Sequence, residues 1–268
     1  MENKPLISVI MGIYNCAETL EEAVDCIINQ TFTDWELIMC DDCSKDNTYE
    51  VALKLAEKDS RIIVIKNEKN LTLAPTLNRC IDIAKGEYIA RMDGDDVCDI
   101  TRFEKELDFL KNNPQYAIVS SLMNLYDKYG VYRTIMYREK PLKESFIKGS
   151  QFCHAGCMMR TEAIKAVGGY SESMNYKRVE DFDLWVRMYK KGYIGYNIQE
   201  ALYSMRDDRN AISRRTLESR KNEARVIKNA YKWFNLPKKY IIYVITPIIK
   251  WLVPNSLYKL LHKNGVNK

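Results

Sequence analysis

The sequence lacks the glycine-rich motif that would mark a dinucleotide-binding dehydrogenase. No Gly-x-Gly-x-x-Gly follows the first predicted strand, where the chain reads Gly12-Ile13-Tyr14-Asn15-Cys16. The glycines of that motif let the backbone approach a pyrophosphate closely, so we exclude this class of enzyme. Internal repeats are absent as well, and 268 residues are enough for one domain with a large core.

The eight cysteines lack the spacing of a zinc finger or zinc ribbon. Cys40 and Cys43 form a Cys-x-x-Cys, and Cys153 and Cys157 lie four residues apart, but Cys40 belongs to a predicted buried strand. Buried cysteines usually behave as small hydrophobic residues, so we expect neither zinc nor redox chemistry here. Because no signal peptide pattern begins the chain, we expect free thiols in a reducing cytoplasm.

Acidic residues are absent from residues 231–268, which contain seven lysines. Residues 1–230 hold 34 basic and 36 acidic residues, so the positive excess of the chain lies in this tail. Its apolar stretches, 240–249 and 251–253, are interrupted by Pro247 and Lys250. They fall short of the ~20 residues that a membrane-spanning helix needs. The aromatic residues expected at the interface are Trp233, Phe234, Tyr240, Tyr243, Trp251 and Tyr258.

This composition predicts a helix or helix pair that lies on an anionic membrane surface. Aromatic side chains favour the membrane interface, and anionic lipid attracts each nearby lysine by about 1 kcal/mol. The alternative is a C-terminal helix that packs on the rest of the protein and leaves its lysines in solvent. Nucleic acid is not an expected partner, because no nucleic-acid-binding motif accompanies the charge.

Strand and helix patterns alternate through the first hundred residues. The strand patterns are residues 5–13, 35–40, 61–66 and 88–92, and the helical patterns are residues 18–29 and 47–58. A further helix is expected after Thr72, with Pro75 in its first turn and Gly86 at its end. This alternation predicts right-handed βαβ crossovers and an α/β fold with a mostly parallel, doubly wound sheet flanked by helices. Ligands of such sheets bind beyond the carboxyl ends of the strands.

Three carboxylates directly follow the fourth strand pattern. Asp93, Asp95 and Asp96 would repel one another unless a cation or solvent compensated their charge. Mg²⁺ and Mn²⁺ prefer oxygen ligands and typically take one or two protein carboxylates together with substrate phosphates. We therefore expect a phosphate-bearing ligand held through a metal, although the same residues would also suit a polar loop. Asn15 and Asp42 also fall at strand ends and should reach the same crevice.

Several segments share the order and spacing of one known family over about the first 210 residues. They are SVIMGIYN (Ser8–Asn15), QTFTDWELIMCDDCSKDNT (Gln30–Thr48), the pair Asn70-Leu71, GEYIARMDGDD (Gly86–Asp96), GGY (Gly168–Tyr170) and VEDFDLWVRM (Val179–Met188). Together they resemble the family 2 glycosyltransferases of the non-processive bacterial type, which adopt the nucleotide-diphospho-sugar transferase fold named GT-A.

The resemblance implies a division of the chain. Residues 1–212 would form the GT-A catalytic domain, with a nucleotide-sugar half at about 1–97 and an acceptor half at about 98–212. Residues 213–268 would form a helical C-terminal extension at the membrane.

The resemblance also assigns the donor site. Asp42 matches the acid that contacts uracil, Tyr14, Asn15 and Asn70 would line the nucleotide pocket, and Arg79 would contact the base or a phosphate. Without the family, Asp42 is better explained as a turn carboxylate that caps the following helix.

For the cofactor, Mn²⁺ or Mg²⁺, the resemblance implies Asp95 as the direct ligand and Asp96 as a competitor for that place. Asp93 would meet the ribose or the metal. After the last sheet strand, many members carry an Arg-x-His whose histidine approaches the metal or the diphosphate. Asp208 stands where that histidine would be, and an aspartate can also bind a divalent ion.

The pair Glu180-Asp181 opens a predicted helix over residues 180–189. The apolar face of this helix is Phe182, Trp185, Val186 and Tyr189. Acids in a first helical turn are favoured by the helix dipole, so the pair alone suits a structural role. By resemblance, Asp181 is the general base that deprotonates the acceptor hydroxyl, a contribution of about 10²- to 10⁴-fold. Glu180 would orient acceptor or donor hydroxyls.

His154 lies in FCHAGCMMR (Phe152–Arg160), a segment that lies near the acceptor side of the cleft in relatives. A lone histidine in an apolar run is more often a hydrogen-bonded core residue than a ligand. Both readings stay open for His154.

The implied function is inverting transfer of a sugar from a nucleoside-diphosphate sugar, expected to be a UDP-sugar, to a saccharide or lipid-linked saccharide. The setting would be surface polysaccharide synthesis on the inner face of a bacterial membrane. Because the chain lacks the Gln-x-x-Arg-Trp signature and the transmembrane helices of processive members, we expect one sugar per encounter.

Two alternatives come from other classes. A sugar nucleotidyltransferase would carry a glycine-rich, basic loop at the turn after Gly12, and this turn has none. A nucleotide-sugar-binding pseudoenzyme or assembly subunit would have lost Asp181 or the Asp-x-Asp, and both are present.

Overall fold

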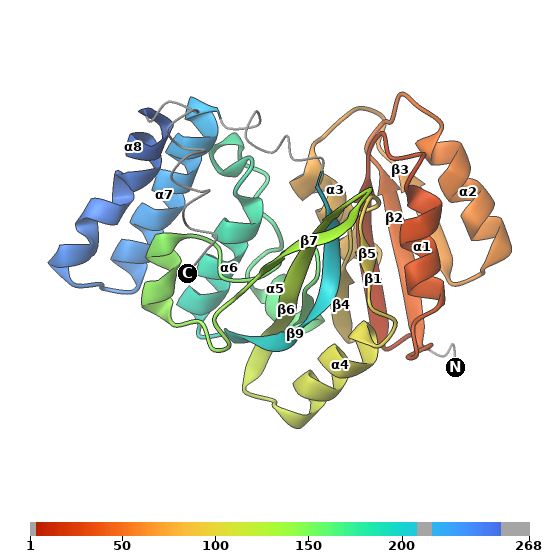
Figure 1. Cartoon of the computed structure of the whole chain (residues 1–268), viewed down its shortest axis with the longest axis horizontal. Helices are drawn as coiled ribbons and strands as arrows, with labels where there is room; N and C mark the ends of the chain where they lie inside the picture. Colours follow the sequence, from red (N-terminus) through yellow and green to blue (C-terminus); the bar gives the residue numbers. More distant parts are fainter. Residues whose placement is uncertain (1–3, 208–215, 253–268) are drawn as a thin grey trace.

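The computed structural model describes residues 4–207 and 216–252, which form a central sheet with helices on both faces (Figure 1). The strands are β1 (Ile7–Ile13), β2 (Trp35–Asp41), β3 (Ile62–Lys66), β4 (Tyr88–Arg91), β5 (Val97–Cys98), β6 (Tyr116–Asp127), β7 (Gly130–Ile135), β8 (Met158–Arg160) and β9 (Ile194–Arg206). The α-helices are α1 (Leu20–Ile28), α2 (Thr48–Lys58), α3 (Leu73–Ile83), α4 (Arg102–Asn112), α5 (Thr161–Ala166), α6 (Glu180–Lys191), α7 (Leu217–Trp233) and α8 (Thr246–Leu252). The 3₁₀ helices are η1 (Lys143–Lys148), η2 (Met174–Tyr176) and η4 (Lys238–Val244).

The sheet runs in the order β3-β2-β1-β4-β8-β6-β9-β5, with β7 paired to β6. Strands β3, β2, β1 and β4 are parallel, which confirms the predicted βαβ alternation. Beyond β4 the sheet is mixed, because β8 runs antiparallel to both β4 and β6, whereas β6 and β9 are parallel. Because β1, β2 and β4 are parallel, the residues that follow them all lie at the carboxyl ends of these strands, on the same side of the sheet.

Two apolar cores lie on opposite faces of the sheet. Successive residues of a strand point to opposite faces, so Ile10 of β1 packs in the core with Leu77 of α3 and Leu184 of α6. Its neighbour Met11 packs in the other core with Val24 of α1 and Phe103 of α4. Figure 1 shows α1 and α2 at one side of the sheet and α6 and α7 at the other.

Helix α7 completes the core that contains α6. Val226, Ile227 and Ala230 of α7 are buried there. Tyr240 and Tyr243 of η4, two of the predicted interfacial aromatics, pack against the same core and stay partly exposed. Within residues 4–207 and 216–252, no helix combines the length and the apolar character that crossing a bilayer requires.

The connection between α3 and β4 corrects the prediction that Gly86 ends the helix. Helix α3 ends at Ile83, and its cap residue Ala84 is extended. Gly86 lies against β1, where its N–H donates to Ser8 Oγ at 2.7 Å, and that hydroxyl donates to the Glu36 carboxylate at 2.6 Å. A Cβ on Gly86 would lie 2.5 Å from the Ser8 backbone nitrogen. Close backbone approach, and not a helix cap, requires glycine here.

We expect Gly86→Ala to lower the free energy of unfolding by about 2–3 kcal/mol, because the added methyl group must displace β1 backbone. Urea denaturation measures the loss. Gly168→Ala is the control, since its φ is positive but a Cβ there would meet no atom within 4 Å, and about 1 kcal/mol is expected from the left-handed backbone alone. An equal or smaller loss for Gly86→Ala would mean that β1 moves aside freely.

Candidate active site

Two cavities meet at the carboxyl edge of the parallel strands. The small cavity, of about 380 Å³, lies between the end of β1, the start of α3 and the segment that precedes α6. The large cavity, of about 820 Å³, reaches from the loop after β1 to the end of β9. Gly12, Tyr14, Leu73 and Arg178 line both. The two cavities are therefore neighbouring parts of one cleft.

Asp42 lines the small cavity, and its buried carboxylate is held from several directions. It accepts hydrogen bonds from the backbone N–H groups of Leu71 and Thr72 at 2.7 and 2.9 Å. Asn67 Nδ2 donates to it at 2.7 Å. The carboxylate thus fixes the chain at the start of α3 and does not cap α2. Asn70 lines the same cavity and donates to the Asp42 carbonyl at 3.2 Å.

Tyr14 and Asn15 follow β1 and occupy different parts of the cleft. Tyr14 is 45% exposed and lines both cavities. Asn15 lines only the large cavity, in a left-handed conformation with φ of 51°. Its Oδ1 accepts from the Lys45 N–H at 2.8 Å, and its own N–H donates to Ser44 Oγ at 3.0 Å. Asn15 therefore joins the loops that follow β1 and β2.

Asp93, Asp95 and Asp96 lie together on the wall of the large cavity. Each can offer one carboxylate oxygen, and these atoms lie within 4.8 Å of one another. A compact donor set made only of oxygen suits Mg²⁺ or Mn²⁺. The structure therefore brings the three predicted metal-site residues to one point.

Hydrogen bonds distinguish Asp96 from Asp95. Tyr203 Oη and the Arg206 N–H donate to the Asp96 carboxylate, both at 2.8 Å. Burial, together with the negative charges of the cluster, raises the pKa of Asp96 to about 7. Asp95 is exposed to the cleft, and no other described side chain donates to its carboxylate. Asp95 is thus the member of the cluster that is freest to bind a cation.

Arg91, the last residue of β4, lies buried next to the cluster. Its guanidinium pairs with the Asp93 carboxylate at 2.5 and 2.6 Å, and its side chain is 2% exposed. Loss of solvent within the cleft and the charge of Asp93 raise the pKa of Asp95, and burial raises the pKa of Glu180 and Asp181. The positive charge of Arg91 opposes the shift in each of them. One buried cation therefore acts both on the strand-end carboxylates and on the acids of α6.

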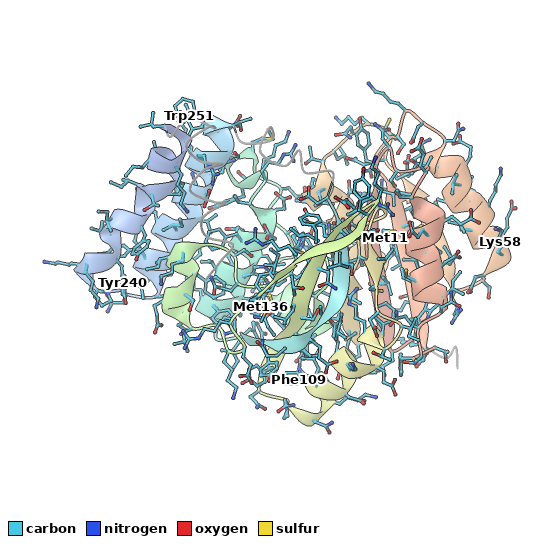
Figure 2. All side chains as sticks on the ribbon, in the orientation of Figure 1. Met11, Lys58, Phe109, Met136, Tyr240 and Trp251 are labelled. Atoms are coloured by element: carbon cyan, nitrogen blue, oxygen red, sulfur yellow. The ribbon has the colours of Figure 1, made fainter. Side chains whose placement is uncertain are left out.

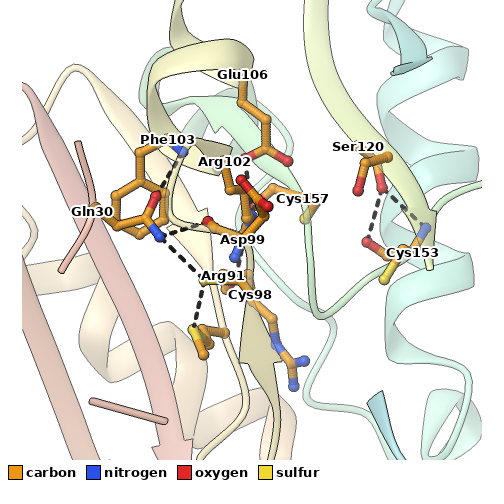
Figure 3. Close-up of polar contacts among 12 residues, drawn as sticks. Gln30, Arg91, Cys98, Asp99, Arg102, Phe103, Glu106, Ser120, Cys153 and Cys157 are labelled. Atoms are coloured by element: carbon orange, nitrogen blue, oxygen red, sulfur yellow. Dashed lines mark hydrogen bonds and ion pairs between the residues drawn. The ribbon is translucent and has the colours of Figure 1, made fainter. Parts of the chain in front are cut away.

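A second buried arginine fixes the end of β4 (Figure 3). Arg102 Nη2 donates to the carbonyls of Arg91 at 2.9 Å and Cys157 at 3.3 Å. Its Nε pairs with Glu106 at 3.2 Å, and both of these side chains are fully buried. Burial raises the pKa of Glu106 to about 7, although the charge of Arg102 opposes the shift. These contacts hold the backbone from which the Asp93–Asp96 loop departs.

Glu180 and Asp181 begin α6, which confirms the helix predicted at these acids. Glu180 lines the small cavity. Asp181 is partly buried, and Ser150 Oγ donates to its Oδ2 at 3.3 Å. Burial raises the pKa of Asp181, while the Phe182 N–H at the helix start and Ser150 favour its ionised form. A general base benefits from a pKa raised in this way.

His154 lies beside the site without lining either cavity. Its Nε2 is 2.8 Å from Tyr170 Oη. Burial and the charge of Arg91 lower the pKa of His154 well below its usual value, so the ring is neutral at pH 7. This placement is that of a hydrogen-bonded core residue, and the acceptor role stays a prediction.

Of the other predicted residues, Asp181 lines neither cavity, and Arg79 is held by neighbouring residues. Arg79 donates to the Lys66 carbonyl at 2.8 Å and also to the Asn67 side chain, and it lines neither cavity, so its nucleotide contact stays a prediction. Asp208 lies outside the described residues.

Sequence reasoning missed Arg91 and Arg178. A signal existed for Arg91, because an arginine inside an apolar strand must find acidic partners. No comparable signal marked Arg178, which lines both cavities.

Comparison with known proteins identifies relatives along most of the chain. The model of the family "Glycosyl transferase family 2" matches residues 8–168. "Putative glycosyltransferase EpsE" of Bacillus subtilis (strain 168) is 39% identical over 267 residues, which cover 99% of this chain and 96% of that protein. "UDP-Glc:alpha-D-GlcNAc-diphosphoundecaprenol beta-1,3-glucosyltransferase WfaP" of Escherichia coli is 32% identical over 187 residues, which cover 70% of this chain and 71% of that protein.

Solved structures share the fold at low sequence identity. S. aureus TarS 1-349 in complex with UDP-GlcNAc matches with a TM-score of 0.70 and 17% identity, covering 92% of this chain and 71% of that chain. The mannosyltransferase PcManGT from Pyrobaculum calidifontis, in complex with GDP-Man and Mn²⁺, matches with a TM-score of 0.64 and 15% identity, covering 99% of this chain and 81% of that chain. These matches confirm the GT-A fold. Since the family model covers more than half of the sequence, this chain is a glycosyltransferase that belongs to glycosyl transferase family 2.

Proposed function

We propose that this glycosyltransferase moves a sugar from a UDP-sugar to a saccharide hydroxyl, with inversion at the anomeric carbon, in surface polysaccharide synthesis. The observation that carries the proposal is one cleft lined by Asp42, by the carboxylates of Asp93, Asp95 and Asp96, and by Glu180, with Asp181 next in the chain at the start of α6. The relatives support a uridine donor: the name of WfaP states UDP-Glc, and TarS has been solved with UDP and with UDP-GlcNAc.

The nucleoside would occupy the small cavity, and the diphosphate the large one. The small cavity offers the Tyr14 ring, the Asp42 carboxylate and the Asn70 amide, a mixture of apolar surface and a few fixed polar groups that is typical of ligand pockets. Because Asp42 is already held by the start of α3, binding a base there would require little reorganisation.

In the large cavity, Asp95 would hold Mn²⁺ or Mg²⁺ together with Asp93 or Asp96. When bound, the ion would neutralise the charge that builds on the departing diphosphate. The protein supplies the positioning: Arg91 pairs with Asp93, and Tyr203 holds Asp96. Both carboxylates are therefore oriented before a ligand arrives.

Asp181 is the proposed general base. The acceptor oxygen forms a bond to the anomeric carbon while the bond from that carbon to the diphosphate oxygen breaks, and the hydroxyl proton passes to the Asp181 carboxylate. Ser150 keeps that carboxylate oriented. A single displacement inverts the anomeric carbon and needs no covalent intermediate. Glu180, which lines the small cavity, would orient sugar hydroxyls.

We also propose that the tail contacts an anionic membrane through an apolar face, which would present a lipid-linked acceptor. The residues of this face are Ile241, Ile242, Ile245, Ile249, Trp251 and Leu252, each between 43% and 67% exposed. In Figure 2, Tyr240 and Trp251 mark the two ends of this part of the tail, at the edge of the molecule opposite Lys58. Several exposed apolar side chains within twelve residues indicate a binding surface. Residues 231–268 also carry seven lysines and no acidic residue, which favours anionic lipid.

Removal of the Asp95 carboxylate should make UDP binding insensitive to divalent metal. The affinity for UDP is expected to fall at least about tenfold in Asp95→Ala, or in the unchanged protein when a chelator removes Mn²⁺, because weakening a metal site costs at least this factor. Isothermal titration calorimetry measures the affinity for UDP. Asp82→Ala, which removes an exposed carboxylate from α3, is the control. Equal affinity with and without metal in the unchanged protein would overturn the metal assignment.

Asp181→Asn should lower the rate of sugar transfer by about 10² or more, because a general base is lost, and should leave the affinity for UDP unchanged. Asp181 accepts a proton only when ionised, and burial raises its pKa above 3.8. We therefore expect kcat/KM to fall as the pH drops through that raised pKa, and the variant to lose this acidic limb. Transfer at a near-normal rate together with a lower Tm would make Asp181 a helix-terminal acid.

The tail face is tested with the double substitution Ile242→Glu and Ile249→Glu in the full chain. Binding to vesicles that contain anionic lipid should fall at least about tenfold. Each isoleucine is expected to contribute on the order of 1 kcal/mol when the membrane covers it, and the anionic lipid would repel the added glutamates. Vesicle sedimentation measures binding, with Ile100→Glu, at a side chain that is 53% exposed outside the tail, as the control. Unchanged vesicle binding, or none by the original protein, would favour a tail that only packs on the domain.

A further inference from the structure

Residues 171–178, which we call the strap, form much of one wall of the small cavity. Six strap residues line it: Ser171, Glu172, Ser173, Met174, Lys177 and Arg178. Apart from the short η2, the strap has no regular secondary structure. Its path therefore depends on contacts from other elements.

Side chains from two helices hold the strap. Asn78 of α3 donates to Glu172 Oε1 at 2.8 Å. Towards the other end, Asn222 of α7 donates through Nδ2 to the carbonyls of Met174 and Lys177, both at 3.1 Å. Asn222 is 3% exposed. Helix α7 of the C-terminal extension thus holds the backbone that leads into the cleft.

Arg225 fixes Asn222 in turn. Arg225 Nη1 donates to Asn222 Oδ1 and to the carbonyl of Asn175, both at 2.8 Å. Asn222 therefore uses its amide nitrogen on the strap and its amide oxygen on Arg225. A buried amide with both ends satisfied has little freedom to turn.

Arg178 ends the strap between the two cavities. Its φ is 70°, which is uncommon for a residue with a Cβ. Its backbone N–H favours the ionised carboxylate of Glu180. Within the described residues, its guanidinium has neither a hydrogen bond nor an ion pair. Of the described residues that line both cavities, Arg178 is the cation.

The large cavity needs such a cation. Its acidic lining residues are Glu18, Asp46, Asp93, Asp95, Asp96 and Asp207. The cations among its described lining residues are Arg178 and Arg206, and the guanidinium of Arg206 is bound to Glu22 and to the Asp95 carbonyl. A diphosphate placed here would face net negative charge. Positive charge on the facing wall would offset that repulsion in addition to a metal.

We propose that the Arg178 guanidinium binds the diphosphate of the donor and that Asn222 is a positioning residue that acts through the strap. This inference rests on the proposed function, which places a nucleoside diphosphate in the cleft. A guanidinium can pair with two phosphate oxygens at once. With the nucleoside in the small cavity and the diphosphate in the large one, Arg178 would lie where the ribose is joined to the phosphates.

Calorimetry with UDP and with uridine, both in the presence of Mn²⁺, tests Arg178. Arg178→Ala should weaken UDP binding about 10- to 100-fold, the loss expected for hydrogen bonds to a charged group, and leave uridine binding unchanged. Arg178→Lys should recover part of the loss, because it keeps the charge without the planar fork. Lys228→Ala, which removes an exposed charge from α7, should bind UDP like the unchanged protein.

A double-mutant cycle tests Asn222. Asn222→Ala alone should weaken UDP binding in the same direction as Arg178→Ala. In the Arg178→Ala background it should change UDP affinity less than about twofold, because its effect passes through Arg178. Additive losses would overturn the positioning role. Should Asn222→Ala fail to fold, Asn222→Asp keeps the size and the oxygen that Arg225 needs while removing the amide donors.

The outcomes separate this inference from the proposed function. Equal UDP affinity in Arg178→Ala and in the unchanged protein would overturn the role of Arg178 and leave the proposed function intact. If the unchanged protein binds GDP and not UDP, the uridine assignment fails, and the same comparison with GDP and guanosine decides the role of Arg178. Absence of binding to any nucleoside diphosphate would overturn both.

Discussion

The positive charge buried at the end of β4 constrains the rest of the site. Leaving Arg91 unpaired at 2% side-chain exposure would cost several kcal/mol, so the fold must bring acids to it. Asp93 pairs with it directly, while Glu180 and Asp181 lie within reach of its field from α6. Without this charge, the strand-end carboxylates and the acids of α6 would lose a buried cation that favours the ionised form of Asp95, Glu180 and Asp181. The strand-end carboxylates and the acids of α6 are therefore coupled electrostatically through Arg91.

Tyr203 connects the mixed half of the sheet to the strand-end carboxylates. This residue of β9 is fully buried, and its hydroxyl donates to Asp96 at 2.8 Å. A Cβ on Gly156 would lie 2.7 Å from the Tyr203 ring, so only glycine lets the turn before β8 pass over the ring. Because β8 joins β4 to β6, the same glycine helps to bring the two halves of the sheet together next to the carboxylates of Asp93, Asp95 and Asp96.

Local sequence patterns predicted the strands and the helix that carry the site residues. Contacts between residues far apart in the sequence determine how these elements are held together. Period-two and period-3.6 spacing predicted β1, β2, β4 and α6, because each buries a face that its own residues define. The role of Gly86 depends on Ser8, 78 residues away, and the fixing of the strap depends on Asn222, 48 residues beyond Met174. No window of sequence contains both members of such pairs. The same holds for Tyr240 and Tyr243, because no local pattern marks their packing against the core of α6 and α7.

Helix α7 connects the C-terminal extension to the rest of the protein in two ways, by packing and by hydrogen bonds. It packs against α6 and η2 on one side and against η4 and α8 on the other, and its Asn222 holds the strap. Cutting the chain at the end of α7 would also remove Phe234 and Tyr240 from the core, so truncation would disturb the cleft and the tail together. Substitutions on the exposed isoleucines change the apolar face alone. If that face rests on a membrane, α7 determines how the cleft is turned towards it, because the same helix fixes both.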